Sequence, residues 1–95
     1  MTVTPKFGVI LAEHLAHPEQ AAKYLTACYE EGPEVFLQGL RDVVEAPGGM
    51  TQAARLAKLN RESLYRQLSR RGNPGLASLN ALLTALGLKV QIAPV

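Results

Sequence analysis

The chain has 95 residues, of which 47% are hydrophobic and 19% are charged, and a chain this short seldom holds two independent hydrophobic cores. We therefore expect one globular domain over residues 1–95. A single cysteine excludes an internal disulfide framework and a multi-cysteine zinc site. The sequence has neither an apolar run of transmembrane length nor the layout of a signal peptide, so we expect a cytoplasmic protein that does not bind a membrane.

The net charge of +2 hides an uneven distribution of charge along the chain. Residues 1–47 carry seven Asp or Glu and three Lys or Arg, whereas residues 48–95 carry one Glu and seven Lys or Arg. Six of those seven cations lie between Arg55 and Arg71, and such a concentration attracts a polyanion through counterion release. An ordinary solvated basic face is the competing interpretation.

Apolar spacing and turn residues predict three helices in the first half of the chain. The first covers residues 7–16 and ends before a proline. The second has Pro18 at its first position and runs to Glu31, where a glycine and a second proline end it. The third covers residues 34–46, with apolar side chains at helical spacing.

The pattern of residues 50–69 predicts two short helices with a tight turn between them. Three alanines allow a crossing helix to approach closely, and three leucines form the apolar wedge that holds two helices at a steep angle. These residues are Ala53, Ala54, Ala57, Leu59, Leu64 and Leu68. Asn60 is a good N-cap for the second helix, which should begin at Arg61 and end at about Ser69. This spacing is that of a helix-turn-helix.

The last predicted elements are a helix over residues 76–86 and a short strand over residues 88–92. The helix has a stripe of five leucines and ends at Gly87, and the strand is predicted by its alternation of apolar and polar residues. A single strand needs a partner. Residues 76–93 could pair with a second copy across a two-fold axis or pack against a cognate protein, and we favour the homodimer.

The second helix of the motif carries most of the candidate DNA-binding residues, because in a helix-turn-helix this helix enters the major groove. With Leu64 and Leu68 facing inward, a step of about 100° per residue turns the polar side chains outward. The candidates are Glu62, Ser63, Arg66, Ser69 and Arg70 for the groove, with Tyr65 on the flank, and Gln52, Arg61, Arg71 and Asn73 for the phosphates. Arg66 is the first choice for a bidentate contact to guanine O6 and N7.

Other motifs give little support for metal binding or catalysis. His14 and His17 are three residues apart, but no further ligand cluster lies near them in the sequence, so we expect neither a metal site nor a cofactor. Gly48 and Gly49 lack the Gly-Lys-Ser/Thr continuation of a phosphate-binding loop. Ser63 has no histidine near it and no nucleophile-elbow glycines, so we expect no enzymatic activity.

Three stretches together resemble one known family: Arg-Glu-Ser-Leu-Tyr-Arg-Gln-Leu-Ser at residues 61–69, Gly-Asn-Pro at 72–74 and Ala-Leu-Gly-Leu at 85–88. They closely resemble the probable addiction-module antidote proteins, HigA-like antitoxins of bacterial type II toxin-antitoxin pairs, over residues 20–93. The resemblance implies a Cro/repressor-like helix-turn-helix. Together with the elements predicted above, we expect an all-α, lambda-repressor-like helix-turn-helix domain of five to six helices with a short C-terminal strand. It also implies binding to double-stranded operator DNA, autorepression of transcription and a cognate toxin of the RelE/ParE type.

Two positions depart from the pattern of this family. Where the family usually has glycine, at the turn after the first motif helix, this chain has Lys58, and a left-handed backbone there would cost about 1 kcal/mol. Where the family tends to have a Ser or Thr cap after Asn-Pro, this chain has Gly75, at a loss of about a few tenths of a kcal/mol. Neither departure affects Arg66 or Gln52.

Two other functions stay open on the sequence. A free-standing repressor would bind DNA in the same way but would have no toxin gene beside its own. A helical protein-interaction module would use its basic face for an acidic protein, and would bind DNA weakly and without sequence preference at physiological salt.

Overall fold

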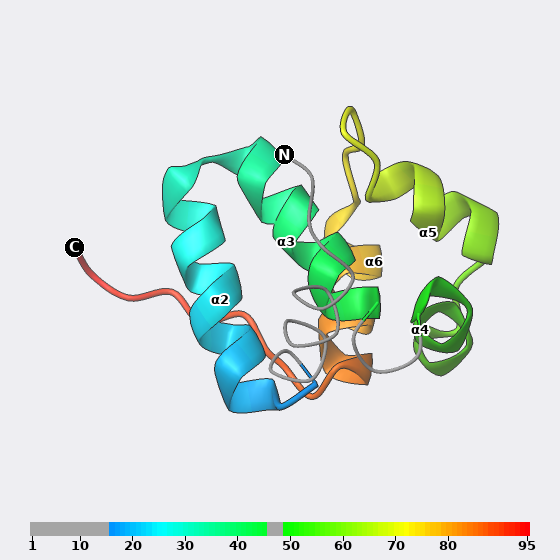
Figure 1. The fold of residues 1–95 in the computed structure, drawn as a ribbon, viewed down its shortest axis with the longest axis horizontal. Coiled ribbons are helices and arrows are strands. Elements are labelled where there is room, and N and C mark those ends of the chain that lie inside the picture. Colours follow the sequence, from blue (N-terminus) through cyan, green and yellow to red (C-terminus); the bar gives the residue numbers. More distant parts are fainter. Residues whose placement is uncertain (1–15, 46–48) are drawn as a thin grey trace, which may run out of the picture.

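The computed structural model describes residues 16–45 and 49–95, and these residues form five α-helices (Figure 1). They are α2 (Pro18–Glu31), α3 (Pro33–Glu45), α4 (Gly49–Ala57), α5 (Arg61–Gln67) and α6 (Leu76–Ala85). The predicted helix over residues 7–16 lies outside the described residues except for Ala16, which stands in a turn. The described part of the chain is therefore all-helical, as expected, and none of its helices is long and apolar enough to cross a membrane.

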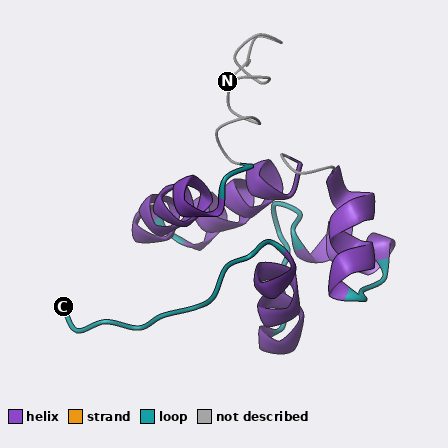
Figure 2. Ribbon diagram, turned by 90° about the horizontal axis from the view of Figure 1, so that it is seen from below, coloured by secondary structure: helices purple, strands orange, loops and turns teal. Residues whose placement is uncertain are grey.

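The two helices predicted for residues 18–46 are confirmed, and they pack side by side (Figure 2). A glycine permits this close approach, because a Cβ atom on Gly39 would lie 2.7 Å from the sulfur of Cys28. Any larger residue at position 39 would therefore push α3 away from α2. Burial raises the pKa of the Cys28 thiol, so this cysteine is a packing residue rather than a reactive thiolate.

The core is one cluster of buried side chains that includes residues from all five helices. Its largest fully buried members are Leu40, Val43, Val44, Leu64, Leu68 and Leu82. On α4, Ala53 and Ala54 are only 2% and 3% exposed. Their small size lets α5 and α6 pack closely against α4, which is the role that the sequence predicted for these alanines.

The predicted strand over residues 88–92 is wrong, because the described residues contain no strand and the chain after α6 extends away from the helices (Figure 2). Leu88 is still anchored, since its N–H donates to the Leu83 carbonyl at 2.8 Å and its side chain packs against the core. Beyond it, Val90 and Ile92 are 55% and 93% exposed. A strand needs a neighbouring backbone to pair its N–H and C=O groups, and the described part of this chain places none beside the tail.

The last helix begins and ends close to its predicted bounds. It starts at Leu76 and ends at Ala85, one residue before the predicted end. Gly75 stands at its N-cap and has no side chain that could accept a hydrogen bond from the first turn. The cap that the family pattern supplies with Ser or Thr is therefore missing here.

Replacing Leu68 with alanine should lower the free energy of unfolding by about 2–5 kcal/mol, because truncating a fully buried leucine leaves a cavity. Leu68 is 0% exposed. Urea denaturation followed by circular dichroism measures the change. Leu76→Ala is the control: Leu76 is 78% exposed, so its truncation should change the stability by less than about 0.5 kcal/mol. Equal losses in the two variants would contradict the packing described above.

Candidate nucleic-acid interface

Helices α4 and α5 are joined by a turn of three residues, Lys58, Leu59 and Asn60. The turn is held by backbone hydrogen bonds from the Lys58 N–H to the Arg55 carbonyl at 3.2 Å and from the Leu59 N–H to the Ala54 carbonyl at 2.9 Å. Asn60 is the N-cap of α5, as predicted, and its side-chain oxygen accepts from the Ser63 N–H at 2.9 Å. The turn and the cap together set the point at which α5 begins.

Lys58 adopts the left-handed backbone conformation, with φ at +58°, and is the one non-glycine residue with positive φ in the described part of the chain. A side chain in this conformation costs about 1 kcal/mol relative to glycine. The chain therefore builds a left-handed turn, which glycine would favour, and accepts the strain of a lysine there. The hydrogen bonds of the turn and the partial burial of Leu59 against the core offset that strain.

The orientation of α5 follows from its two buried leucines. Leu64 is 1% exposed and Leu68, just after the helix, is 0% exposed. Four of the candidate residues lie on the exposed face that remains, namely Arg61, Glu62, Tyr65 and Arg66, with Ser63 half-buried beside them. Tyr65 is 64% exposed, and a guanidinium nitrogen of Arg66 donates to Ser63 Oγ at 3.3 Å. The Arg66 side chain is thus outside the core, as the groove-facing role requires.

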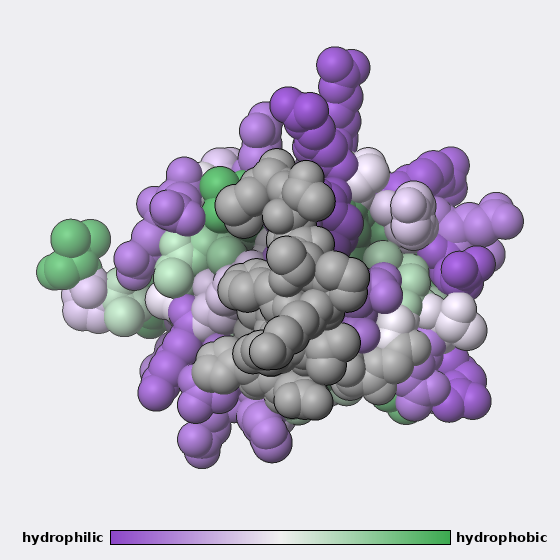
Figure 3. Space-filling view, in the orientation of Figure 1, coloured by the Kyte–Doolittle hydropathy of each residue, from purple (hydrophilic) through white to green (hydrophobic). Residues whose placement is uncertain are grey.

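The segment after α5 brings three further candidates to the same end of the molecule. Arg70, Arg71 and Asn73 are all exposed, and Figure 3 shows hydrophilic side chains extending from α5 and from this segment. The segment turns back sharply at Gly72, whose N–H donates to the Ser69 carbonyl at 2.8 Å. A Cβ atom at this position would lie 2.0 Å from the Gln67 carbonyl oxygen, so only glycine fits without a shift of the backbone.

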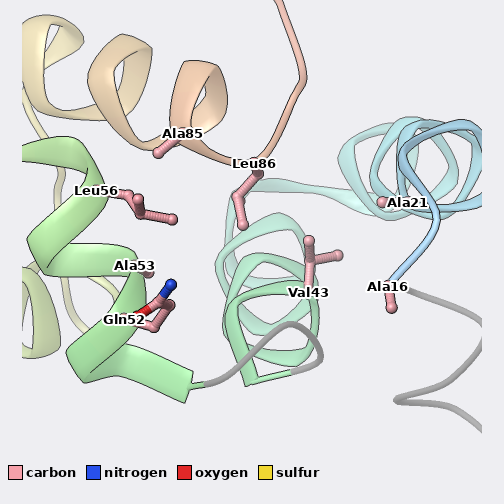
Figure 4. A pocket seen from close by; sticks show the side chains of 8 residues that line it. All are labelled: Ala16, Ala21, Val43, Gln52, Ala53, Leu56, Ala85 and Leu86. Carbon is pink, nitrogen blue, oxygen red and sulfur yellow. The ribbon is translucent and has the colours of Figure 1, made fainter.

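Gln52 does not share the exposed position of the α5 candidates. It is half-buried on α4, and its side-chain oxygen accepts a hydrogen bond from the Arg55 guanidinium. Figure 4 shows its amide beside a pocket of about 240 Å³ whose other lining side chains, among them Val43 and Leu86, are apolar. Because this bond uses the Gln52 oxygen as an acceptor, a contact to a phosphate would come from the amide N–H groups of Gln52.

Two arginines at this surface were not among the sequence candidates. Arg55 is exposed on the last turn of α4, three residues after Gln52, and residues three apart lie on the same side of a helix. The spacing of Gln52 and Arg55 could therefore have identified Arg55 as a candidate from the sequence. Arg41 belongs to α3, and its guanidinium donates to the Leu68 carbonyl at the end of α5. No local pattern in the sequence predicts this contact, because the two residues are 27 apart in the chain.

Arg41 is held in place by a chain of polar contacts that reaches α2. Its guanidinium also donates to the Gln38 side-chain oxygen at 2.5 Å, and Gln38 in turn donates to Asp42 at 3.2 Å. The Tyr24 hydroxyl donates to the other Asp42 oxygen at 2.6 Å. Burial, and then this hydrogen bond to a carboxylate, raise the pKa of Tyr24, so the hydroxyl keeps the proton that it donates. The network joins α2 and α3 to the C-terminal end of α5.

Of the two histidines that the sequence analysis considered, the structure describes only His17. His14 lies outside the described residues, and His17 is the exposed residue just before α2. Residues 16–45 and 49–95 contain no group of three or more His, Cys, Asp or Glu side chains that could hold a metal ion.

Comparison with known proteins adds an independent observation to this geometry. The family model described as "Probable addiction module antidote protein" matches residues 5–94. The chain belongs to this family. A protein of Haemophilus influenzae, described only as uncharacterized, is 39% identical over 83 residues, which are 86% of this chain and 84% of the relative. No solved structure matches the chain.

The left-handed turn predicts a difference between two substitutions of the same residue. Lys58→Gly and Lys58→Ala both remove the lysine side chain, but only glycine relieves the strain of the +58° φ angle. We expect the glycine variant to be more stable than the alanine variant by about 1 kcal/mol, measured by urea denaturation. An alanine variant as stable as the glycine variant would show that the turn is not built with a left-handed residue at this position.

Proposed function

We propose that this protein is a DNA-binding antitoxin that represses transcription of its own operon and neutralises a toxin of the RelE/ParE type. The observation that carries the proposal is the α5 surface, where two buried leucines leave Arg66 exposed among other cations, in a member of an antidote family. In this proposal, α4, the turn and α5 are a helix-turn-helix, with α5 as the helix that enters the major groove.

The exposed side chains of α5 have the chemistry that base edges require. The planar fork of Arg66 matches the O6 and N7 acceptors of guanine. Glu62 can accept a hydrogen bond from cytosine N4, and the Ser63 hydroxyl can bond to either base of a pair. Tyr65, on the flank of the helix, adds apolar contact. The mixture of one acidic and several basic or polar side chains suits sequence reading better than a uniformly basic face would.

Phosphate contacts would come from the cations and amides around α5. Arg61 is the first residue of α5, and Arg71 and Asn73 follow the helix in an exposed segment. Arg55 and Gln52 lie together on α4, the helix that crosses the backbone in this binding mode. Each cation that neutralises a phosphate releases counterions, so the affinity should fall steeply with salt concentration.

Membership of the antidote family supports the second half of the proposal, the neutralisation of a toxin. Toxin and antidote genes are neighbours in the systems that this chain resembles. A reading frame for about a hundred residues rich in Lys and Arg beside this gene would therefore support the antitoxin function. Its absence would favour a repressor that acts without a toxin.

We further propose that the protein is a homodimer that uses α6 and the tail, residues 76–93. The tail carries exposed apolar side chains, among them Val90 and Ile92, and Figure 3 shows apolar side chains at its end. Exposed apolar side chains on an extended segment gain free energy when a partner covers them. A dimer would also present two copies of α5 to two half-sites of an operator.

Arg66→Ala should weaken binding to the DNA upstream of this gene by about 1–3 kcal/mol and should relax the preference for one sequence. Arg71→Ala is a matched control, because it removes the same charge from a phosphate-contacting position. It should weaken binding to all sequences alike and lower the salt slope by about 1. Mobility-shift titrations at several salt concentrations measure both effects.

Two results of these titrations would contradict the proposal. If Arg66→Ala keeps the affinity and the sequence preference, Arg66 does not read a base. If the unchanged protein binds all DNA equally at physiological salt, it is not a sequence-specific repressor, and a helical interaction module becomes the better interpretation.

Replacing both Val90 and Ile92 with aspartate should convert the dimer to a monomer, because burying four carboxylates at a two-fold interface is strongly unfavourable. Sedimentation equilibrium measures the change. Val35→Asp is the control, since Val35 is also an exposed apolar residue, lies outside residues 76–93 and stands in the first turn of α3, where a carboxylate is tolerated. A double variant that dimerises like the unchanged protein would rule out the tail as the dimer contact.

A further inference from the structure

The corner between α2 and α3 exposes an apolar surface that the DNA-binding proposal does not use. Tyr29 is 68% exposed, Val35 is 37% exposed and Phe36 is half-buried. The rings of Tyr29 and Phe36 pack edge to face, with centroids 5.4 Å apart and planes at 86°. We call this surface the corner patch and define it as Tyr29, Val35 and Phe36 together with Glu30, Glu31 and Glu34.

The corner patch is held in one conformation before any partner arrives. The Gly32 N–H donates to the Tyr29 carbonyl at 3.1 Å, and the Phe36 N–H donates to the Gly32 carbonyl at 3.0 Å. Phe36 packs against the core on its inner side and supports the Tyr29 ring on its outer side. A tyrosine that is fixed in this way loses little conformational entropy on binding, and tyrosine is among the residues enriched at binding hot spots.

The charge around the corner patch restricts the kind of partner. Residues 29–36 include three glutamates and no Lys or Arg, and all three glutamates are exposed. Their charge repels a phosphate backbone, so nucleic acid does not fit this surface. A second copy of the patch does not fit either, because a two-fold contact would place one set of carboxylates against another. A surface with basic side chains around an apolar centre is complementary to it.

We propose that the corner patch is the docking surface for a basic protein partner, with Tyr29 as its central contact. This inference rests on the proposed function, in which that partner is the toxin. The patch lies across the molecule from α5 (Figure 1), within a chain whose longest dimension is 35 Å. In this proposal the partner and DNA therefore bind separate surfaces of the protein.

Two exposed tyrosines allow a matched experiment. Tyr29 is 68% exposed at the corner patch, and Tyr65 is 64% exposed on α5. The probes are the purified protein encoded by the reading frame beside this gene, and the DNA upstream of the gene. Tyr29→Ala should weaken binding of the protein probe about tenfold or more and leave DNA binding unchanged. Tyr65→Ala should leave binding of the protein probe unchanged.

A second pair of variants separates the aromatic contact from the charge and from any loss of folding. Tyr29→Phe keeps the ring and should bind the protein probe within about twofold of the unchanged protein. Replacing Glu30, Glu31 and Glu34 with glutamine should slow association about tenfold at low salt, and this difference should shrink as salt is added. Calorimetry and stopped-flow measurements at two salt concentrations supply these values.

The possible outcomes separate a failure of the docking proposal from a failure of the proposed function. If the unchanged protein binds the protein probe and Tyr29→Ala binds it equally well, the corner patch is not the docking surface, although the antitoxin function stands. If the unchanged protein does not bind the protein probe, both the antitoxin function and the docking proposal are wrong. If Tyr29→Ala changes only the oligomeric state, the patch is a contact between copies and the docking proposal is also wrong.

Discussion

Burial of Leu64 and Leu68 is the interaction on which the other features of this protein depend. Helix α5 has seven residues, which is too short for a helix to be stable without tertiary packing. The two leucines hold it against α4 and the rest of the core, and helical periodicity then decides which side chains stay outside. Arg66 is exposed because Leu64 and Leu68 are buried. The candidate interface is thus a consequence of core packing.

Helix α3 belongs to the acidic half of the chain and packs against helices of the cationic half. Its buried valines and leucines belong to the same core as α5, and Arg41 donates to the carbonyl at the end of α5. The first turn of α3 carries part of the corner patch. One rigid helix therefore contributes to the support of the proposed DNA-reading helix and to the proposed docking surface, so the distance between the two surfaces is set by the packing of α3.

Local signals in the sequence were enough to predict most of the helices and the cap of α5. Pro18 begins α2, Asn60 caps α5, and two of the three alanines predicted to face a crossing helix, Ala53 and Ala54, are buried, whereas Ala57 is half-buried. These predictions are correct because each depends on a few neighbouring residues and on helical periodicity. The alternation of residues 88–92 was misleading, because the same pattern arises whether or not a partner strand is present, and only a partner makes a strand.

Residue order alone was enough to predict the described helices, the leucines that face inward and the part of the chain that is cationic, since periodicity and charge are local properties. Tertiary structure alone decided that Arg41 reaches the end of α5, that Gln52 lies beside a pocket lined by residues of other helices, and that Tyr29 packs against Phe36. Those three contacts depend on how the helices and the corner between α2 and α3 are packed, and no local pattern of residues specifies that geometry.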